Sequence, residues 1–85
     1  MRTIYKYEMN TSETYISLPD GAEPVKVDLD PHGARSIWIL LNPELPKNNT
    51  RCFVIKGTGH TIDNNLWYVG SFKEQPFVWH VFEKL

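Results

Sequence analysis

The residues most suggestive of chemistry lie in Gly57-Thr58-Gly59-His60, where two glycines flank a threonine and a histidine follows. Closely spaced glycines allow backbone N–H groups to form a concave turn that holds an anion, and Thr58 and His60 would add polar contacts. A dinucleotide-binding fingerprint needs a third glycine and a following helix, and a P-loop needs its lysine; neither pattern is present. Two interpretations stay open, a turn at the corner of a β-sheet and a loop that contacts a ligand.

The three histidines give no metal-site pattern. His32, His60 and His80 lie in separate segments, without the short ligand spacings of a zinc site. Asp28 and Asp30 could meet a divalent cation together with His32 at the end of a strand. The proline and glycine beside His32 favour a simple turn with solvated acids instead. We therefore predict no metal site.

Catalytic groupings are missing as well. Cys52 alternates with Val54, which predicts a small buried hydrophobic residue. A pairing of Cys52 with His60 or His80 across strands is geometrically allowed, but no neighbouring residue indicates an activated thiolate. No serine lies in a nucleophile elbow, and the carboxylates are scattered. The sequence thus predicts a protein that is not an enzyme and needs no cofactor.

Aromatic residues are the other candidate for binding. Flat rings stack on bases at little entropic cost, and His80, within an apolar segment, could add a polar contact. The rings that could wall a pocket are Trp38, Trp67, Tyr68 and Trp79. The alternative is that a small core uses its tryptophans for burial. The predicted ligand-binding residues are Thr58, His60, Trp67 and Trp79, with Arg35 or Arg51 facing a phosphate.

Extended segments must position these side chains, because no segment keeps apolar residues at helical spacing over three turns. Period-two alternation or short apolar runs occur at residues 4–9, 14–18, 24–30, 36–42, 51–56, 66–72 and 76–82. This pattern predicts an all-β fold, a single small antiparallel β-sandwich or barrel of six to seven strands over residues 1–85. Residues 44–50 or 61–66 could add one short helical turn.

Three details of this β-domain can be predicted. Residues 36–42 are apolar on both faces, which indicates a central, doubly covered strand. Val25, Val27 and Leu29 alternate with charged residues and are expected to share one face. Residues 73–75 separate the last two segments and are expected to form the turn of a closing hairpin.

Charge and composition exclude several classes of protein. Nine Lys and Arg stand against ten Asp and Glu, a formal net charge of −1 with no basic stripe, which disfavours binding to duplex nucleic acid. No apolar run approaches the roughly 20 residues that span a membrane, and the first ten residues lack the apolar block of a signal peptide. One cysteine cannot form an internal disulfide, which suits the cytoplasm.

The whole chain resembles a family of short proteins from bacteriophages and their prokaryotic hosts that has no established activity. The matching stretches are Thr3-Ile4-Tyr5-Lys6-Tyr7, Leu18-Pro19-Asp20-Gly21-Ala22, Ile37-Trp38-Ile39-Leu40-Leu41-Asn42-Pro43, Gly57-Thr58-Gly59-His60 and Val78-Trp79-His80-Val81-Phe82-Glu83. In that family the first stretch usually continues with a proline, where this chain has Glu8. The resemblance implies a small, cytoplasmic, phage-associated protein.

Two functions are expected from these observations. The first is a non-enzymatic binding protein that antagonises a host defence or regulatory system, either by sequestering a nucleotide-like signal or by blocking a host protein. The alternative is a minor structural or assembly accessory that pairs through exposed sheet edges. Uncovered edges also favour a homo-oligomer, and we expect any ligand to bind at the subunit boundary.

Overall fold

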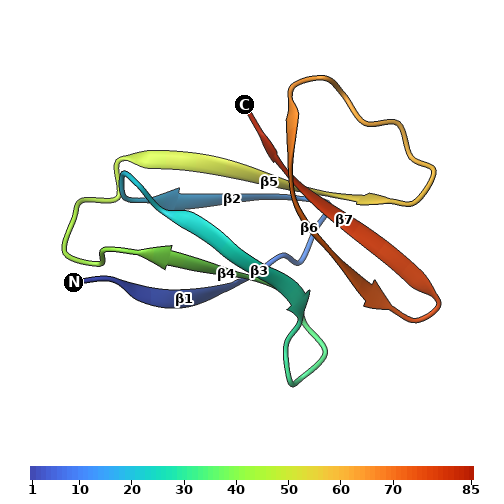
Figure 1. Cartoon of the computed structure of the whole chain (residues 1–85), viewed down its shortest axis with the longest axis horizontal. Coiled ribbons are helices and arrows are strands. Elements are labelled where there is room, and N and C mark those ends of the chain that lie inside the picture. Colours follow the sequence, from blue (N-terminus) through green and yellow to red (C-terminus); the bar gives the residue numbers. More distant parts are fainter.

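Seven β-strands and no helix make up the computed structural model, which describes all residues 1–85 (Figure 1). The strands are β1 (Thr3–Glu8), β2 (Glu13–Leu18), β3 (Glu23–Leu29), β4 (Arg35–Leu41), β5 (Asn49–Gly57), β6 (Leu66–Glu74) and β7 (Phe77–Lys84). The predicted all-β fold is confirmed. Neither residues 44–50 nor residues 61–66 form a helical turn. No helix is therefore available that could cross a membrane.

The strands form two antiparallel sheets that pack like a sandwich. The three-stranded sheet has the order β1-β4-β3, and the four-stranded sheet has the order β2-β5-β7-β6. Because β7 lies between β5 and β6, the segment from Thr58 to Asn65 must run back along β7 to the start of β6. This long connection is where the Gly57–His60 stretch lies (Figure 1).

The core fills the space between the two sheets. Its twelve buried residues are Met9, Ile16, Leu18, Ala22, Val27, Ile37, Ile39, Leu41, Phe53, Ile55, Phe72 and Val81. Every strand except β1 contributes at least one residue to this core, because alternate side chains of a strand point to the same face. Each buried Val, Leu, Ile or Phe side chain stabilises the fold by about 1.5–3 kcal/mol.

The strand covered on both faces is β5, not β4 as predicted. In β4 the inward residues Ile37 and Ile39 are fully buried, but Trp38 and Leu40 on the other face stay partly exposed. In β5 all four consecutive residues 52–55 are at most 7% exposed. The reason is position: β5 lies inside the wider sheet, where side chains of β2 and β7 flank its outer face.

Two β-bulges shape the side of the sandwich where β3 lies beside β6. The bulge in β3 between Pro24 and Lys26 turns Val25 outward, so that it is 48% exposed and does not share the buried face of Val27 as predicted. The bulge in β6 between Tyr68 and Gly70 brings Gly70 against Val27. A Cβ at Gly70 would lie 2.7 Å from Val27 Cγ2, so only glycine permits this approach.

The closing hairpin of β6 and β7 is longer than predicted. Strand β6 continues through Glu74, and the turn is formed by Gln75 and Pro76, rather than by residues 73–75. Glu74 pairs with Phe77 at the end of the ladder, and its carboxylate accepts hydrogen bonds from Arg35 and Trp79. The two strands therefore project together as an extended arm at one end of the molecule (Figure 1).

Candidate ligand-binding site

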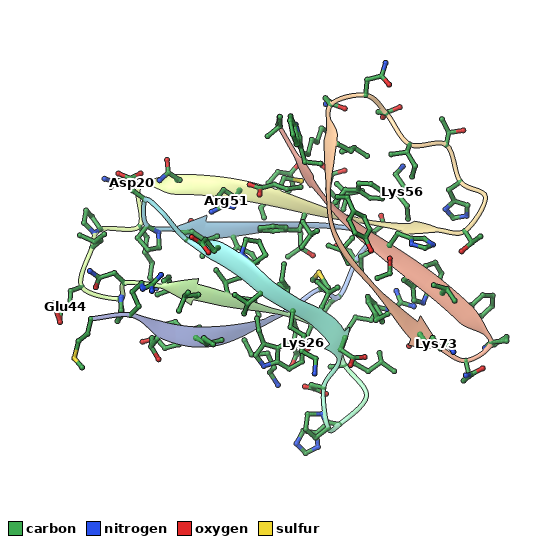
Figure 2. The ribbon with its side chains drawn as sticks, in the orientation of Figure 1. Asp20, Lys26, Glu44, Arg51, Lys56 and Lys73 are labelled. Atoms are coloured by element: carbon green, nitrogen blue, oxygen red, sulfur yellow. The ribbon has the colours of Figure 1, made fainter.

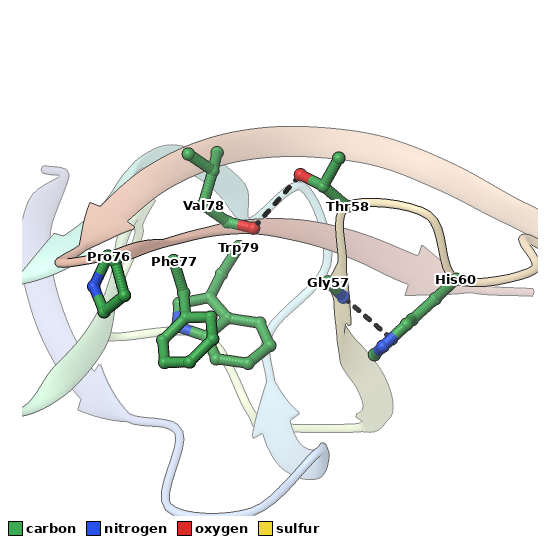
Figure 3. Close-up of a pocket in the computed structure, with 7 residues that line it drawn as sticks. All are labelled: Gly57, Thr58, His60, Pro76, Phe77, Val78 and Trp79. Atoms are coloured by element: carbon green, nitrogen blue, oxygen red, sulfur yellow. Dashed lines mark hydrogen bonds between the residues drawn. The ribbon is translucent and has the colours of Figure 1, made fainter.

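A pocket of about 360 Å³ lies between the Gly57–His60 turn and the end of the β6–β7 hairpin (Figure 3). The turn follows β5, and the hairpin residues begin β7, so the two walls come from adjacent strands of one chain. The lining residues are Gly57, Thr58, His60, Pro76, Phe77, Val78 and Trp79. Rings and apolar groups form one wall, and the polar turn forms the other.

The turn itself is held by two hydrogen bonds between Gly57 and His60. The His60 backbone N–H donates to the Gly57 carbonyl at 3.1 Å, and the Gly57 N–H donates to His60 Nδ1 at 3.0 Å. Because a backbone N–H can only donate, Nδ1 must be the unprotonated nitrogen, and the neutral ring carries its proton on Nε2. Gly59 has a φ of +92°, a conformation that glycine adopts without strain. His60 Nε2–H is thus left as a donor.

Gly57 is required for a different reason, because a side chain at this position would be too close to two rings. A Cβ at this position would lie 3.0 Å from His60 Cε1 and 3.2 Å from Trp79 Cζ3. The two rings therefore close over the bare Cα of Gly57 (Figure 3). The glycine allows the imidazole and the indole to approach the same point of the backbone.

Trp79 is fixed by two side chains from outside the pocket. Its indole Nε1–H donates to Glu74 Oε1 at 2.9 Å, and the guanidinium of Arg35 lies 4.9 Å from the ring centroid. Arg35 also pairs with the same carboxylate, at 2.8 Å from Nη2. The hydrogen bonds from Arg35 and then Trp79 lower the pKa of Glu74. Phe77 lies 5.5 Å from Trp79 between ring centroids and is 56% exposed, so it presents an open ring at the pocket.

A chain of hydrogen bonds extends from the pocket across the outer face of the four-stranded sheet. The Thr58 hydroxyl donates to the Val78 carbonyl at 3.4 Å, so Thr58 Oγ1 can accept from His80 Nε2 at 2.9 Å. His80 Nδ1 then accepts from the Ser71 hydroxyl at 2.8 Å. Ser71 in turn accepts from the Tyr68 hydroxyl at 2.8 Å. In this arrangement each of the four donors, Thr58, His80, Ser71 and Tyr68, has an acceptor within this hydrogen-bond network.

The structure brings only part of the predicted site together. Thr58, His60 and Trp79 line one pocket, and Arg35 lies behind Trp79 rather than in the opening. Trp67 is 62% exposed beside a second, smaller pocket of about 220 Å³ on β6.

Arg51 is occupied elsewhere (Figure 2). Its Nε and Nη2 donate to the two carboxylate oxygens of Glu83 at 2.6 and 2.8 Å, and Nη1 donates to the Ala22 carbonyl at 2.6 Å. These bonds use the groups that would contact a phosphate. The Glu83 hydrogen bond, opposed by burial, raises the pKa of Arg51.

Four lining residues of the pocket were not among the predicted ligand-binding residues: Gly57, which lies in the glycine turn, and Pro76, Phe77 and Val78. A signal was present for Phe77, because the alternation of residues 77–82 places it on the same face as Trp79. No sequence signal indicated Pro76, because its place at the pocket depends on where the hairpin turns. Ser71 was missed for a related reason: only the bulge in β6 puts it on the same face as Tyr68, three residues before it.

The other residues considered for chemistry have structural partners. Cys52 is buried as predicted, its thiol lies 3.6 Å from Glu13 Oε1 rather than beside a histidine, and burial raises its pKa. Asp30 accepts hydrogen bonds from Lys6 and from the backbone of His32 and Ala34. No group of three or more His, Cys, Asp or Glu residues is arranged to hold a metal ion.

Comparison with known proteins adds a family but no activity. A family model described as a domain of unknown function (DUF7352) matches residues 1–85. No curated protein and no solved structure matches the chain.

Proposed function

The chain belongs to this family of unknown function, and from the geometry of its pocket we propose that it is a non-enzymatic binding protein for a small, flat, anionic ligand such as a nucleotide. The observation that carries the proposal is the meeting of aromatic rings and unused N–H donors in one pocket. Binding pockets commonly combine an apolar wall with a few placed polar groups.

The donors of the pocket favour an acceptor on the ligand. Among the lining residues, Thr58 has a backbone N–H that donates to no other group in the chain, and His60 Nε2–H is also unused. The N–H of Gly59, next in the turn, is free as well. Adjacent N–H groups in a turn attract phosphate or carboxylate oxygens. On the opposite wall, Phe77 and Trp79 offer faces on which a base could stack.

In the cell, we propose that binding removes a nucleotide-like signal from a host defence or regulatory system, or blocks a host protein of that system. The resemblance to phage-associated proteins supports this role, as does the lack of any catalytic grouping. A protein of this kind acts by occupying its partner, so its effect should scale with its amount rather than with time.

The test is a thermal-shift screen against cyclic and linear nucleotides, followed by calorimetric titration of every nucleotide that raises the Tm. The informative variant is His60→Asn, because the Asn Oδ1 can replace Nδ1 as acceptor for the Gly57 N–H while the Nε2–H donor is lost. Phe77→Ser removes the open ring. Tyr5→Ser, at an exposed ring on β1, is the matched control.

We expect at least one nucleotide to stabilise the wild-type protein, with the affinity reduced about tenfold in His60→Asn and in Phe77→Ser and unchanged in Tyr5→Ser. An unchanged Tm at saturating concentrations of all nucleotides would remove the nucleotide-binding function.

A second candidate function is that of a structural or assembly accessory. Strands β1 and β2 each pair on one side only, and Tyr5 and Tyr15 are exposed on them. Such edges can add a strand from another chain, including a second copy of this one. Recovery of the protein within virions, and light scattering of the purified protein above the mass of one chain, would favour this candidate.

A further inference from the structure

The outer face of the four-stranded sheet carries exposed aromatic rings. Paired residues on neighbouring strands share a face, so the register places Tyr15, Phe82 and Tyr68 on this side. Tyr15 and Tyr68 are each 63% exposed. They lie on the two edge strands β2 and β6, separated by three inter-strand spacings of about 4.8 Å, so they are at least about 14 Å apart. Two rings at this separation can each take a different base.

Both tyrosine rings are held in place despite their exposure. The Tyr68 hydroxyl donates to Ser71, and the edge of its ring packs on Phe82 at 5.7 Å between centroids. The Tyr15 hydroxyl donates to Glu13 at 2.5 Å. A ring already fixed in one rotamer loses little conformational entropy when a base stacks on it.

This face carries a net positive charge, whereas the molecule as a whole has a formal net charge of −1. The register places three lysines on it, Lys56, Lys73 and Lys84, and one carboxylate, Glu13, which lies 3.7 Å from Lys84. Lys56 and Lys73 form no ion pair. Both lie toward the β6–β7 hairpin, whereas Asp20 and Glu44 lie at the opposite end (Figure 2). A chain with a net charge of −1 thus keeps two unpaired lysines, Lys56 and Lys73, on the same face as the exposed rings.

We propose that this outer face binds single-stranded nucleic acid, with Tyr15 and Tyr68 stacking on bases and Lys56 and Lys73 contacting phosphates. Proteins that bind single strands combine cationic groups along the backbone with aromatic platforms, and an antiparallel sheet with base-stacking aromatics is one such platform. A duplex offers its phosphates but not its base faces, so the exposed rings favour a single strand over a duplex.

This surface differs from the proposed nucleotide pocket. Trp79 and Phe77 alternate with His80 along β7 and therefore point to the other side of the sheet. Thr58 and Val78 lie where the two regions meet. A variant such as His60→Asn should therefore leave binding on the outer face unchanged, and the two proposals can fail separately.

The experiment is fluorescence anisotropy with labelled 12-nucleotide oligothymidylate, oligouridylate and a duplex of equal length, between 50 and 200 mM salt. We expect both single strands to bind more tightly than the duplex. Neutralising two phosphates predicts that log K falls with log salt at a slope of about −1.4. The double variant Lys56→Gln/Lys73→Gln should bring this slope close to zero.

Substitution of a ring separates stacking from charge. Tyr68→Leu should weaken binding about tenfold with the salt slope unchanged, whereas Tyr68→Phe, which keeps the ring, should retain most of the affinity. Lys26→Gln and Tyr5→Leu are the controls on the other sheet. Circular dichroism of each variant verifies the fold.

Three results would overturn the proposal: no binding of either single strand at 50 mM salt, duplex binding as tight as single-strand binding, or equal losses in the control variants. A preference between oligouridylate and oligothymidylate would identify the natural strand as RNA or DNA.

Discussion

At the scale of single residues, Asp30 shows how a buried charge is stabilised in a chain this small. Its side chain is 2% exposed and accepts a hydrogen bond from Lys6 Nζ at 2.6 Å. The backbone N–H groups of His32 and Ala34 each donate to it at 2.9 Å. These donors, Lys6 foremost, lower the pKa of Asp30 to about 2. One carboxylate thus fixes the β3–β4 turn and joins it to β1.

The first prediction concerns pH. A carboxyl pKa that is lower in the folded state adds stability above the unfolded-state pKa of about 3.9, and this contribution is lost as the pH falls through about 2. Asp30→Asn should therefore lower the free energy of unfolding at pH 7, and its difference from wild type should shrink between pH 4 and pH 2. Urea titrations at several pH values measure this. Asp28→Asn is the control, because that carboxylate is 44% exposed and 3.8 Å from Lys26. A pH-independent difference for Asp30→Asn would contradict the assignment.

At the scale of elements, the bulges decide which side chains meet. In β6 the extra residue lets Tyr68 and Ser71 share a face and turns Gly70 toward Val27 of β3. The two strands are not joined by a ladder, so the sheets meet along that side through side-chain packing, which includes the contact of Val27 with Gly70. Small residues are commonly used where one backbone approaches another element this closely.

The second prediction tests that contact. Gly70→Ala would place a methyl group 2.7 Å from Val27 Cγ2, and we expect a loss of about 1–3 kcal/mol in the free energy of unfolding. Val27→Ala alone should also destabilise, because Val27 is only 8% exposed. The double variant Gly70→Ala/Val27→Ala should be more stable than the sum of the two losses predicts, since the smaller side chain removes the clash. Strictly additive losses in chemical denaturation would mean that Gly70 has another role.

At the scale of the whole molecule, Arg51 ties the two sheets. From β5 it reaches both oxygens of Glu83 on β7, and its third bond is to the carbonyl of Ala22, immediately before β3. The side chains of Arg51 and Glu83 are 23% and 19% exposed, so water screens the pair only partly. A planar guanidinium is needed to make these three bonds at once.

The third prediction follows from this geometry. Arg51→Gln should lower the free energy of unfolding by about 2 kcal/mol, somewhat less than the 3–5 kcal/mol of a fully buried pair, because Glu83 loses its partner. Arg51→Lys should recover only part of this loss, since an ammonium cannot form the bidentate contact. The matched control is Lys26→Gln, from a largely exposed pair, which should change the value by about 0.5 kcal/mol or less. If Arg51→Lys had the wild-type free energy of unfolding in urea denaturation, the positive charge alone would account for the stabilisation, without the bidentate contact.

Predictability from sequence differed between the core and the site. Alternation and short apolar runs located the seven strands correctly, because the period of the pattern follows the pleat of the strand. The pattern failed at Val25, where a bulge shifts the register, and at β5, where the position of a strand within its sheet decides burial. For the pocket, the glycine turn indicated Thr58 and His60 and the aromatic residues indicated Trp79, and the fold brings these three together.

What the sequence determined by itself is therefore local: the extended segments, the glycine turn and, away from the two bulges, the alternation of side chains along each strand. Strand order, the two bulges and the partners of the arginines were decided only by the tertiary structure. They depend on contacts between residues distant in the chain, such as Arg51 with Glu83 and Gly70 with Val27, and no local pattern encodes such pairs. The candidate surfaces arise at this second level, because Thr58 meets His80 only after β7 has paired between β5 and β6.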